Sequence, residues 1–231
     1  MHNIKSFLKK NLLRNTFGRR LWQILRAISL LKEKSFRDLF IEINQNDICL
    51  DLGANIGFAS LIMWLRGVNF VYALEPNQEA FKALRKNLKG IKNITILNKA
   101  ISSSTKKEKL FLHQSIKEKA DSEKILAFSQ SSSLLANKTN VGDCFYEVDS
   151  INFKDLYAML PLKPSIIKCD IEGGEYIIYN QLIDLAKSNK VRKIFVECHS
   201  KKYPQFQKDH QNFLQLIYEN NLENIIDTSW H

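Results

Sequence analysis

The sequence contains little glycine and proline and no long hydrophobic run. Eight glycines and four prolines among 231 residues are too few for a collagen-like or low-complexity chain. No apolar stretch reaches the ~18 to 20 residues of a membrane-spanning helix. The apolar segment AISLL near the basic N-terminus is also shorter than the ~7-residue minimum of a secretory signal. With 45% apolar residues, we expect one compact globular domain.

Cysteine is also scarce. No two of the four cysteines are spaced as CxxC, so the sequence does not support a zinc knuckle. Cys49, Cys169 and Cys198 each lie in an apolar, strand-like run and are interpreted as small buried hydrophobes in a reducing compartment. We therefore expect a cytoplasmic protein, with a peripheral membrane location as the alternative.

Positive charge is concentrated at one end of the chain. Residues 1–40 contain ten Lys/Arg and two acids, a balance of +8, whereas residues 41–231 contain twenty-four and twenty-two, a balance of +2. A nearly neutral body argues against a domain built to bind nucleic acid. The pattern indicates a basic helical segment over 1–40 attached to a catalytic domain over 41–231.

The basic segment has a helical pattern. Leu21, Ile24, Leu25, Ile28 and Leu31 recur at helical spacing, and Gly18 is expected to separate two helices. Two interpretations remain open. The segment is either a helical layer that covers one edge of the domain, or a basic amphipathic surface that rests on anionic lipid or an anionic acceptor.

From residue 46 onward, strand-like and helix-like stretches alternate. This pattern predicts an α/β fold with a parallel sheet and helices on both faces. Strands are expected at 47–53, 69–76, 94–102, 107–113, 146–151, 164–173, 191–200 and 223–231, and helices at 58–66, 77–89, 152–160, 175–189 and 206–221. Residues 114–145 are polar and have no clear pattern. In such sheets the ligand lies beyond the carboxyl ends of the strands.

The stretch LDLGANIG ends the first predicted strand with a glycine loop. Gly53 is expected to allow a tight turn with the backbone close to a ligand, and Gly57 to let the next helix pack near the strand. Glu75 closes the second strand, 22 residues after Gly53, where an acid can accept hydrogen bonds from ribose hydroxyls.

The loop spacing favours one nucleoside cofactor over another. Dinucleotide folds use G-x-G-x-x-G, whereas this loop reads G-x-x-x-G and follows Asp51. An acid beside a pyrophosphate is repulsive, but an acid near a sulfonium and an amino group is attractive. The charge placement therefore favours S-adenosylmethionine over a nicotinamide dinucleotide. A purely structural βα turn is the alternative.

Several segments together resemble one enzyme family. DLGANIG, ALEPNQEAFKALRKN, NKAIS, SSSL, IIKCDIEGGEY and FVECH are similar to the class I S-adenosylmethionine-dependent methyltransferases, and within them to the FkbM family, over about residues 46–231. The most specific element is K-x-D-x-E-G-x-E, matched by Lys168, Asp170, Glu172, Gly173 and Glu175. The resemblance implies a Rossmann-like, seven-stranded, mostly parallel sheet and O-methylation of hydroxyl groups, often on sugars or polyketides.

The resemblance also implies cofactor contacts. The first loop would line the methionine end, Glu75 would hold the ribose, and residues 98–101 would flank the adenine, with the Ala100 backbone N–H as donor. The serines at 131–133 match a serine-rich element of the family. The cofactor-binding residues expected on this basis are Asp51, Gly53, Ala54, Asn55, Gly57, Glu75, Pro76, Asn77, Ala100 and Ile101.

The segment KCDIEGGE places acids at the carboxyl end of a predicted strand. Asp170 and Glu172 are two residues apart, so strand alternation predicts that they share a side, where one pKa should be raised. Lys168 lies one step back on that side and could neutralise or orient the pair. On the neighbouring strand Glu197 and His199 are expected to share a face.

Three chemical interpretations of these residues remain open. One of Asp170, Glu172 or His199 is the general base and the others position a sugar. Alternatively, Asp170, Glu197 and His199 hold a divalent metal that lowers the pKa of the acceptor hydroxyl. In the third interpretation the acids only cap the next helix and hold the cofactor amino group.

We therefore expect an S-adenosylmethionine-dependent O-methyltransferase acting on a hydroxyl of a sugar, a glycan or a related small molecule, with no nucleic-acid partner. The alternatives are a nicotinamide-dependent oxidoreductase, a nucleic-acid methyltransferase, and a non-catalytic binding module on the same fold. The basic segment makes an anionic or membrane-proximal acceptor the favoured kind.

Overall fold

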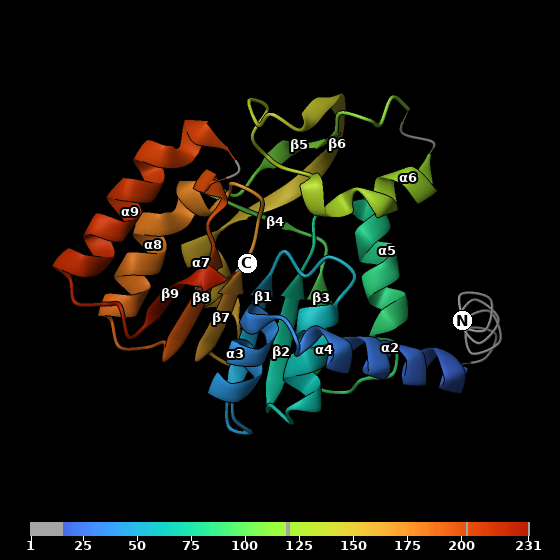
Figure 1. Ribbon diagram of the computed structural model, residues 1–231, viewed down its shortest axis with the longest axis horizontal. Helices are drawn as coiled ribbons and strands as arrows, with labels where there is room; N and C mark the ends of the chain where they lie inside the picture. The colour runs from blue at the N-terminus through green and yellow to red at the C-terminus, as the bar shows by residue number, and fades with distance from the viewer. Residues whose placement is uncertain (1–15, 119–120, 202, 231) are drawn as a thin grey trace.

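The computed structural model describes residues 16–118, 121–201 and 203–230 (Figure 1). Six strands form a parallel central sheet in the order β3-β2-β1-β7-β8-β9. These strands are β1 (Ile48–Leu52), β2 (Phe70–Leu74), β3 (Ile94–Leu97), β7 (Ile166–Cys169), β8 (Lys193–Glu197) and β9 (Ile226–Trp230). The order reverses between β1 and β7, which are neighbours in the sheet, so the switch point lies there.

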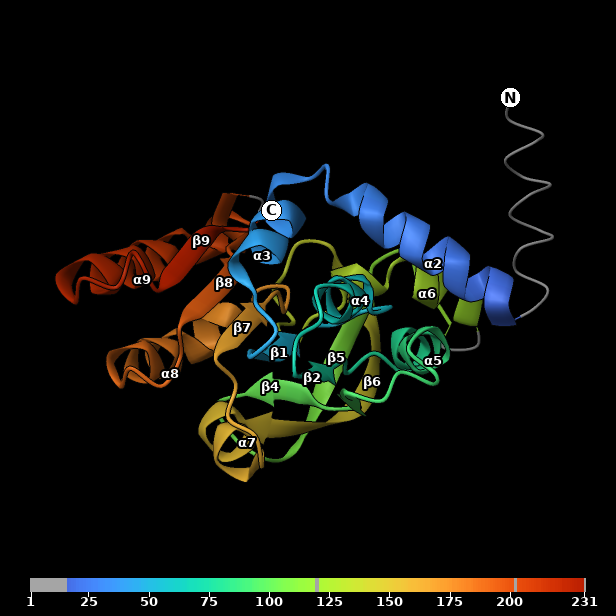
Figure 2. The same cartoon turned by 90° about the horizontal axis from the view of Figure 1, so that it is seen from below.

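Helices cover both faces of this sheet. On one face lie α2 (Thr16–Leu30), α3 (Lys34–Glu42), α4 (Phe58–Leu65) and α5 (Gln78–Asn87), and on the other α7 (Phe153–Met159), α8 (Glu175–Lys187) and α9 (Gln207–Glu219). Figure 2 shows α2, α3 and α4 above the sheet and α7 and α8 below it. Cys49 packs toward the first face and Leu50 toward the second, as period-two alternation requires. The predicted α/β class is confirmed.

The central sheet differs from the expected one in its number of strands. The described residues form six central strands, all parallel, instead of seven mostly parallel ones. The run expected as one strand over 94–102 breaks at Asn98 and Lys99. Its second half, β4 (Ala100–Ser102), leaves the central sheet and pairs with β6 (Val141–Asn152). At the other edge β9 returns through the α9 crossover and therefore runs parallel to β8.

A smaller sheet of order β4-β6-β5 lies in the upper part of Figure 1, with β5 (Lys107–His113) antiparallel to β6. The stretch 114–145 that has no sequence pattern contains the short helix α6 (Ser122–Ala127), a 3₁₀ turn (Ser129–Ser131) and the start of β6. Strand β6 therefore begins five residues before the predicted strand at 146.

The basic segment is joined closely to the sheet. The break between α2 and α3 falls at residues 31–33, and Gly18 lies inside α2, so the expected separation at Gly18 is wrong. The expected boundary between residues 40 and 41 falls inside α3, whose Leu39 is fully buried against the sheet. The first fifteen residues of the segment lie outside the described residues. In the described part of the chain, every helix is too short or too polar to cross a bilayer.

Candidate active site

A cavity of about 450 Å³ opens beside the carboxyl ends of β1, β2 and β7. It lies at the reversal of the sheet order, where α/β sheets bind ligands. Predicted site residues that line it are Gly53, Ala54, Asn55, Glu75, Pro76, Ala100, Ile101, Lys168, Asp170 and Glu172. The predicted residues Asp51, Gly57, Asn77, Glu197 and His199 lie outside this lining.

Gly53 is required by a neighbouring strand end. Its φ is +75°, and a Cβ at this position would lie 1.8 Å from the carbonyl oxygen of Asp170. Its N–H and that of Ala54 both donate to the carbonyl of Leu74, at 3.0 and 2.8 Å. The loop after β1 is therefore pressed between the ends of β2 and β7, so Gly53 allows a close approach to the protein's own chain, a contact not expected from the sequence.

Gly57 also differs from its expected role. It has φ +94° at the N-terminus of α4, and a Cβ would lie 2.7 Å from Leu84 Cδ1 on α5. The glycine therefore allows α4 and α5 to approach each other, rather than the helix and its preceding strand.

Lys168 joins two carboxylates below the cavity. Its Nζ lies 3.3 Å from Asp51 Oδ1 and 3.2 Å from Asp170 Oδ2, and it donates to the carbonyl of Gly53 at 2.9 Å. Asp51 is fully buried, and its other oxygen accepts from the Ser60 hydroxyl at 2.6 Å. Burial lowers the pKa of Lys168, but the charges of Asp170 and Asp51 outweigh it and raise the pKa above its ordinary value. Lys168 thus stays charged and fixes the position of Asp170.

Glu75 is held between two loops. Its Oε2 accepts from the Asn55 N–H and its Oε1 from the Asn77 N–H, both at 2.8 Å. The Asn98 side chain donates to the Glu75 carbonyl at 2.7 Å and braces the same turn. Burial raises the pKa of Glu75 to about 7, against the two backbone hydrogen bonds and the charge of Lys168. Each oxygen keeps a lone pair for a ligand in the cavity.

A serine-rich segment, residues 129–133, closes over the cavity. Ser129 shares a hydrogen bond with Asn55, and Ser132 accepts one from Asn77 at 3.0 Å. Ser133 donates to the backbone carbonyl of Glu172 at 2.8 Å. The sequence resemblance indicated 131–133, but Ser129 was missed because it lies in a stretch without periodicity.

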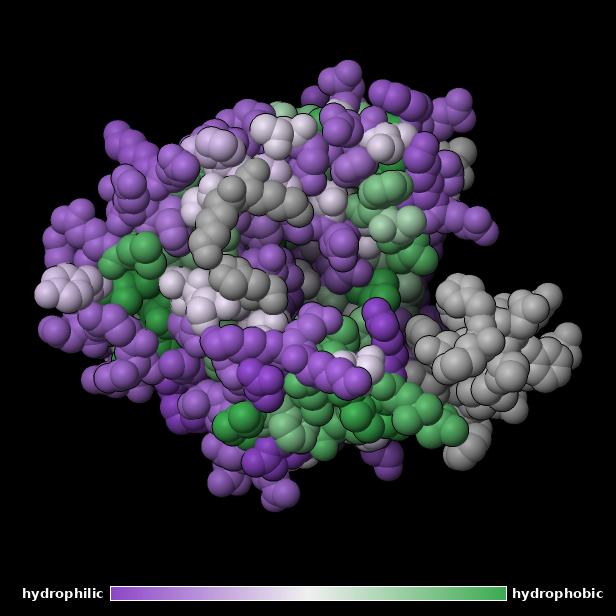
Figure 3. Space-filling view, viewed as in Figure 1, coloured by the Kyte–Doolittle hydropathy of each residue, from purple (hydrophilic) through white to green (hydrophobic). Residues whose placement is uncertain are grey.

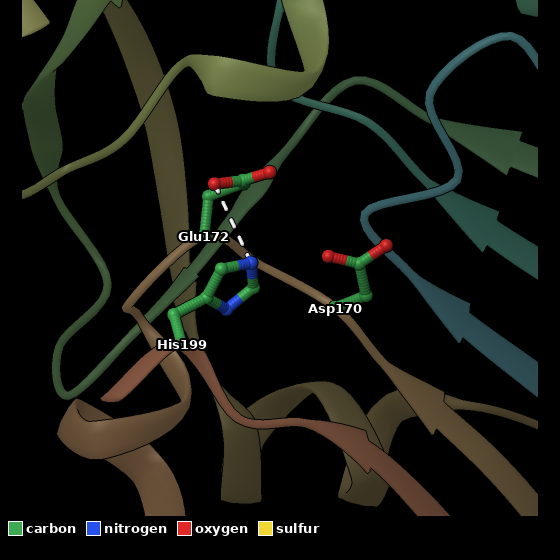
Figure 4. A group of neighbouring side chains, drawn as sticks. All are labelled: Asp170, Glu172 and His199. Atoms are coloured by element: carbon green, nitrogen blue, oxygen red, sulfur yellow. Dashed lines mark ion pairs between the residues drawn. The ribbon is translucent and has the colours of Figure 1, made fainter. Parts of the chain in front are cut away.

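Asp170, Glu172 and His199 converge from two strand ends (Figure 4). One ligand atom from each lies within 4.8 Å of the other two. Strand β7 ends at Cys169, and Glu172 has φ +56° in the following turn. A turn, and not strand alternation, therefore brings the two acids together. Likewise β8 ends at Glu197, and His199 begins a 3₁₀ turn.

His199 is oriented by a carboxylate that the sequence analysis did not assign to it. Its Nδ1 lies 2.8 Å from Oε1 of Glu175, a fully buried residue of α8 whose Oε2 accepts from the Gly173 N–H. Its Nε2 lies 3.5 Å from Glu172 Oε2 and 3.6 Å from Glu197 Oε1. Burial lowers the pKa of His199, but Glu172 and Glu175 raise it to about 11. His199 is therefore an imidazolium at neutral pH in this arrangement.

Lys138 is a second residue that sequence reasoning missed. Its buried Nζ lies 2.5 Å from Glu172 Oε2 and 4.9 Å from the centre of the Tyr203 ring. Burial raises the pKa of Glu172, but His199 and Lys138 outweigh it and leave that pKa below its ordinary value. The pKa of Glu172 is thus not raised by its closeness to Asp170. At Glu197, by contrast, burial and the charge of Asp170 raise the pKa to about 7.

The same cluster has the donor set of a divalent-cation site. Asp170, Glu172 and His199 supply two carboxylates and an imidazole, and Glu175 orients the imidazole as the outer ligands of metal sites do. Glu172 takes the place that the sequence analysis gave to Glu197. Because Lys138 already pairs with Glu172 Oε2 and His199 is an imidazolium, a bound cation would have to displace both that ammonium and the proton on His199 Nε2.

Comparisons with known proteins assign the chain to a family. The sequence pattern described as "Methyltransferase FkbM domain" matches residues 51–223. No curated protein matches the chain at a significant level.

Three solved structures have partial similarity to this chain. A precorrin-6y C5,15-methyltransferase of Geobacter metallireducens is 12% identical over 81% of this chain and 70% of its own, with a TM-score of 0.43. TYW2 of P. horikoshii, solved with MeSAdo, is 24% identical over 29% of this chain and 26% of its own, with a TM-score of 0.27. A SAM-dependent methyltransferase of Agrobacterium tumefaciens is 17% identical over 37% and 25%, with a TM-score of 0.25.

The match to TYW2 thus covers only 26% of the chain of that protein. The family pattern, by contrast, extends over most of this chain, from Asp51 near the end of β1 through the acid cluster to Glu223, just beyond α9. The chain therefore belongs to the FkbM family of methyltransferases.

Proposed function

We propose that the protein is an S-adenosylmethionine-dependent O-methyltransferase that acts on a hydroxyl of a sugar or glycan. The observation that carries this proposal is the arrangement around one cavity. The loop after β1 and Glu75 line it together with the carboxylates of Asp170 and Glu172. A nucleoside donor and a hydroxyl acceptor would meet there.

The hydrogen bonds of the loop after β1 favour a sulfonium nucleoside over a dinucleotide. A pyrophosphate is bound by free backbone N–H groups at such a loop. Here the N–H groups of Gly53 and Ala54 donate to Leu74, that of Asn55 to Glu75, and that of Gly57 to Ala54. Four donors are therefore committed inside the protein, while the Glu75 carboxylate remains available to ribose hydroxyls. This supports S-adenosylmethionine and argues against the oxidoreductase alternative.

Asp170 is the residue that we assign as general base. Its side chain is 26% exposed, lines the cavity, and is held by Lys168. His199 is cationic and is therefore not suited to accept a proton. Glu172 has a lysine partner as Asp170 does, but its side chain is only 17% exposed and is therefore less accessible to an acceptor hydroxyl. In the reaction the acceptor oxygen attacks the methyl carbon, the carbon–sulfur bond breaks to leave a thioether, and the hydroxyl proton passes to Asp170. Positioning of the reacting atoms contributes up to roughly 7–11 kcal/mol in favourable cases.

The acidic side of the cavity supports a neutral, hydroxyl-rich acceptor. Carboxylates such as Asp170 accept hydrogen bonds from the hydroxyls of a sugar. With the balance of only +2 over 41–231, this supports an acceptor that is not a nucleic acid.

The cofactor is tested by calorimetry with S-adenosylmethionine and S-adenosylhomocysteine, with NAD as the comparison. Micromolar binding of both sulfur compounds and none of NAD is the expected result. The acceptor is sought by mass spectrometry of a native glycan pool incubated with a labelled methyl donor. Absence of heat with both sulfur compounds would remove the proposal.

The base is tested with Asp170→Asn, and Asp184→Asn on the outside of α8 is the matched control. Turnover of the first variant should fall by about 10²–10⁴-fold, the contribution of a positioned base. Its affinity for S-adenosylhomocysteine should stay within a few-fold, and the control should resemble the wild type. Wild-type turnover in Asp170→Asn would remove Asp170 from the mechanism.

A metal-assisted mechanism is the second candidate, because Asp170, Glu172 and His199 have suitable donors. EDTA treatment separates the two mechanisms. Turnover that survives EDTA supports proton transfer to Asp170 alone. Turnover that EDTA abolishes and Mg²⁺ restores would instead support the metal.

A further inference from the structure

Helix α2 carries apolar side chains on two different faces. One face, with Gln23, Ala27 and Leu30, is buried against the domain. The Gln23 amide, for example, donates to the Asn87 side chain at 2.7 Å. These residues account for the packing of the helix, so any other apolar stripe on α2 needs a separate explanation.

The second face consists of Leu21, Leu25 and Ile28, which we call the α2 ridge. The spacing of four and three residues places them in one stripe along the helix. Their exposed fractions are 39%, 54% and 50%, and Ile41 on α3 is 68% exposed. Figure 3 shows hydrophobic side chains gathered along α2 and α3, below the hollow in the middle of the same face. Such a grouping of large aliphatic side chains marks an interaction surface.

The charges around the α2 ridge indicate the chemistry of its partner. Lys32, Lys34 and Arg37, which follow α2 in the chain, are all exposed, and residues 16–40 as a whole contain six Lys/Arg and two acids, a balance of +4. An apolar stripe flanked by Lys and Arg is the pattern of a helix that lies in the interface of an anionic membrane. A second copy of this chain would bring the same excess of positive charge to the contact and would be repelled.

The α2 ridge also lies beside the entrance of the candidate active site. Arg26 and Leu30 of α2, with Glu33 and Phe36 just after it, line the same cavity as Asp170 and Glu172. Helix α2 therefore faces the cavity with Arg26 and Leu30 and faces the solvent with the α2 ridge.

We propose that the α2 ridge docks the protein on the surface of an anionic membrane, with the cavity entrance at the lipid headgroups. Leu21, Leu25 and Ile28 enter the boundary between headgroups and acyl chains, and the neighbouring basic side chains contact anionic headgroups. The docking itself does not depend on the proposed function. Its consequence for the acceptor, that the methylated hydroxyl belongs to a membrane-anchored molecule, does rest on that function.

The docking is tested by vesicle flotation of the full chain, with phosphatidylcholine vesicles that contain about a third phosphatidylglycerol and with phosphatidylcholine alone. We expect binding to the anionic vesicles, weaker binding at high salt, and little binding to the neutral ones. Leu25→Glu and Ile28→Glu should each weaken binding at least ten-fold. Leu214→Glu is the matched control, because Leu214 is a 40% exposed leucine on α9, away from the α2 ridge.

Two further measurements keep the outcomes distinct. Thermal unfolding and S-adenosylhomocysteine binding of Leu25→Glu should match the wild type, so loss of vesicle binding is separable from misfolding and from failure of the proposed function. Wild-type chain that does not float, or variants that float as well as the wild type, would overturn the proposal. A dimer in analytical ultracentrifugation that Leu25→Glu dissolves, without vesicle binding, would assign the α2 ridge to a second copy and also overturn it.

Discussion

Replacement of Gly53 by alanine tests how tightly the site and the fold are joined. Gly53 has φ +75°, and the added Cβ would lie 1.8 Å from the Asp170 carbonyl oxygen. That carbonyl belongs to backbone that cannot move freely, because the Asp170 N–H donates to the Leu52 carbonyl at 3.1 Å. The substitution therefore combines an unfavourable dihedral angle with a steric clash against a strand end.

The two contributions can be given approximate magnitudes. A left-handed conformation costs a residue with a Cβ about 1–2 kcal/mol, and overpacking in a closely packed interior costs about 1–3 kcal/mol. We therefore expect Gly53→Ala to lower the free energy of unfolding by about 2–5 kcal/mol. For a chain of this size that corresponds to a melting temperature lower by about 4–20 °C.

Gly90→Ala provides the matched control. Gly90 has φ +84°, but nothing lies within 4 Å of the position that its Cβ would take. It should therefore lose only the dihedral contribution of about 1–2 kcal/mol. Urea unfolding measures both variants, and titration with S-adenosylhomocysteine should show weakened binding for Gly53→Ala alone. Equal destabilisation of the two variants would refute the prediction, because it would show that the steric clash with Asp170 does not lower the free energy of unfolding.

Three further predictions concern buried charges. Lys168→Met should lower the free energy of unfolding by about 3–5 kcal/mol, because it leaves Asp51 buried without its cation; an effect below about 1 kcal/mol in urea unfolding would contradict this. Lys138→Met should have a similar effect through Glu172, measured in the same way, and adding Glu172→Gln should recover part of the loss. Because burial raises the pKa of Glu75 to about 7, its ionised form appears as the pH rises through that value, and ionised carboxylates accept stronger hydrogen bonds. Calorimetry should therefore show roughly three- to ten-fold tighter S-adenosylhomocysteine binding at pH 8 than at pH 6, and pH-independent binding in Glu75→Gln; a pH-independent wild type would oppose the assigned role.

The parts of the fold that could be predicted are those governed by local periodicity. Strand β1 and the loop after it were predicted because a buried parallel strand is a continuous apolar run that ends in glycine. Strand β6 was predicted only in part, because its first residues, from Val141, lie in a polar stretch and pair with β5 through contacts distant in sequence. Gly18 was interpreted as a helix boundary, but a single glycine costs a helix only about 1 kcal/mol and is tolerated inside α2.

In the candidate site, too, features set by local sequence were predicted, whereas features set by contacts distant in sequence were not. Asp170 and Glu172 were predicted from one short segment, but strand alternation did not explain their proximity, since Glu172 has φ +56° in a turn. Lys138 could not have been predicted, because no local pattern places a lysine 34 residues away against Glu172. The pairing of Glu175 with His199 likewise depends on how α8 and β8 pack, which the sequence does not display.

The hydrogen bonds of the serine-rich segment have a kinetic consequence. The segment forms hydrogen bonds with Asn55 after β1, with Asn77 after β2 and with Glu172 after β7. It is therefore attached on three sides of the cavity. If S-adenosylmethionine binds in this cavity, as we propose, these bonds, each worth about 0.5–1.5 kcal/mol, would hold the segment over the spent nucleoside. Departure of the demethylated product, rather than bond making, would then set the steady-state rate, and the first turnover would appear as a burst.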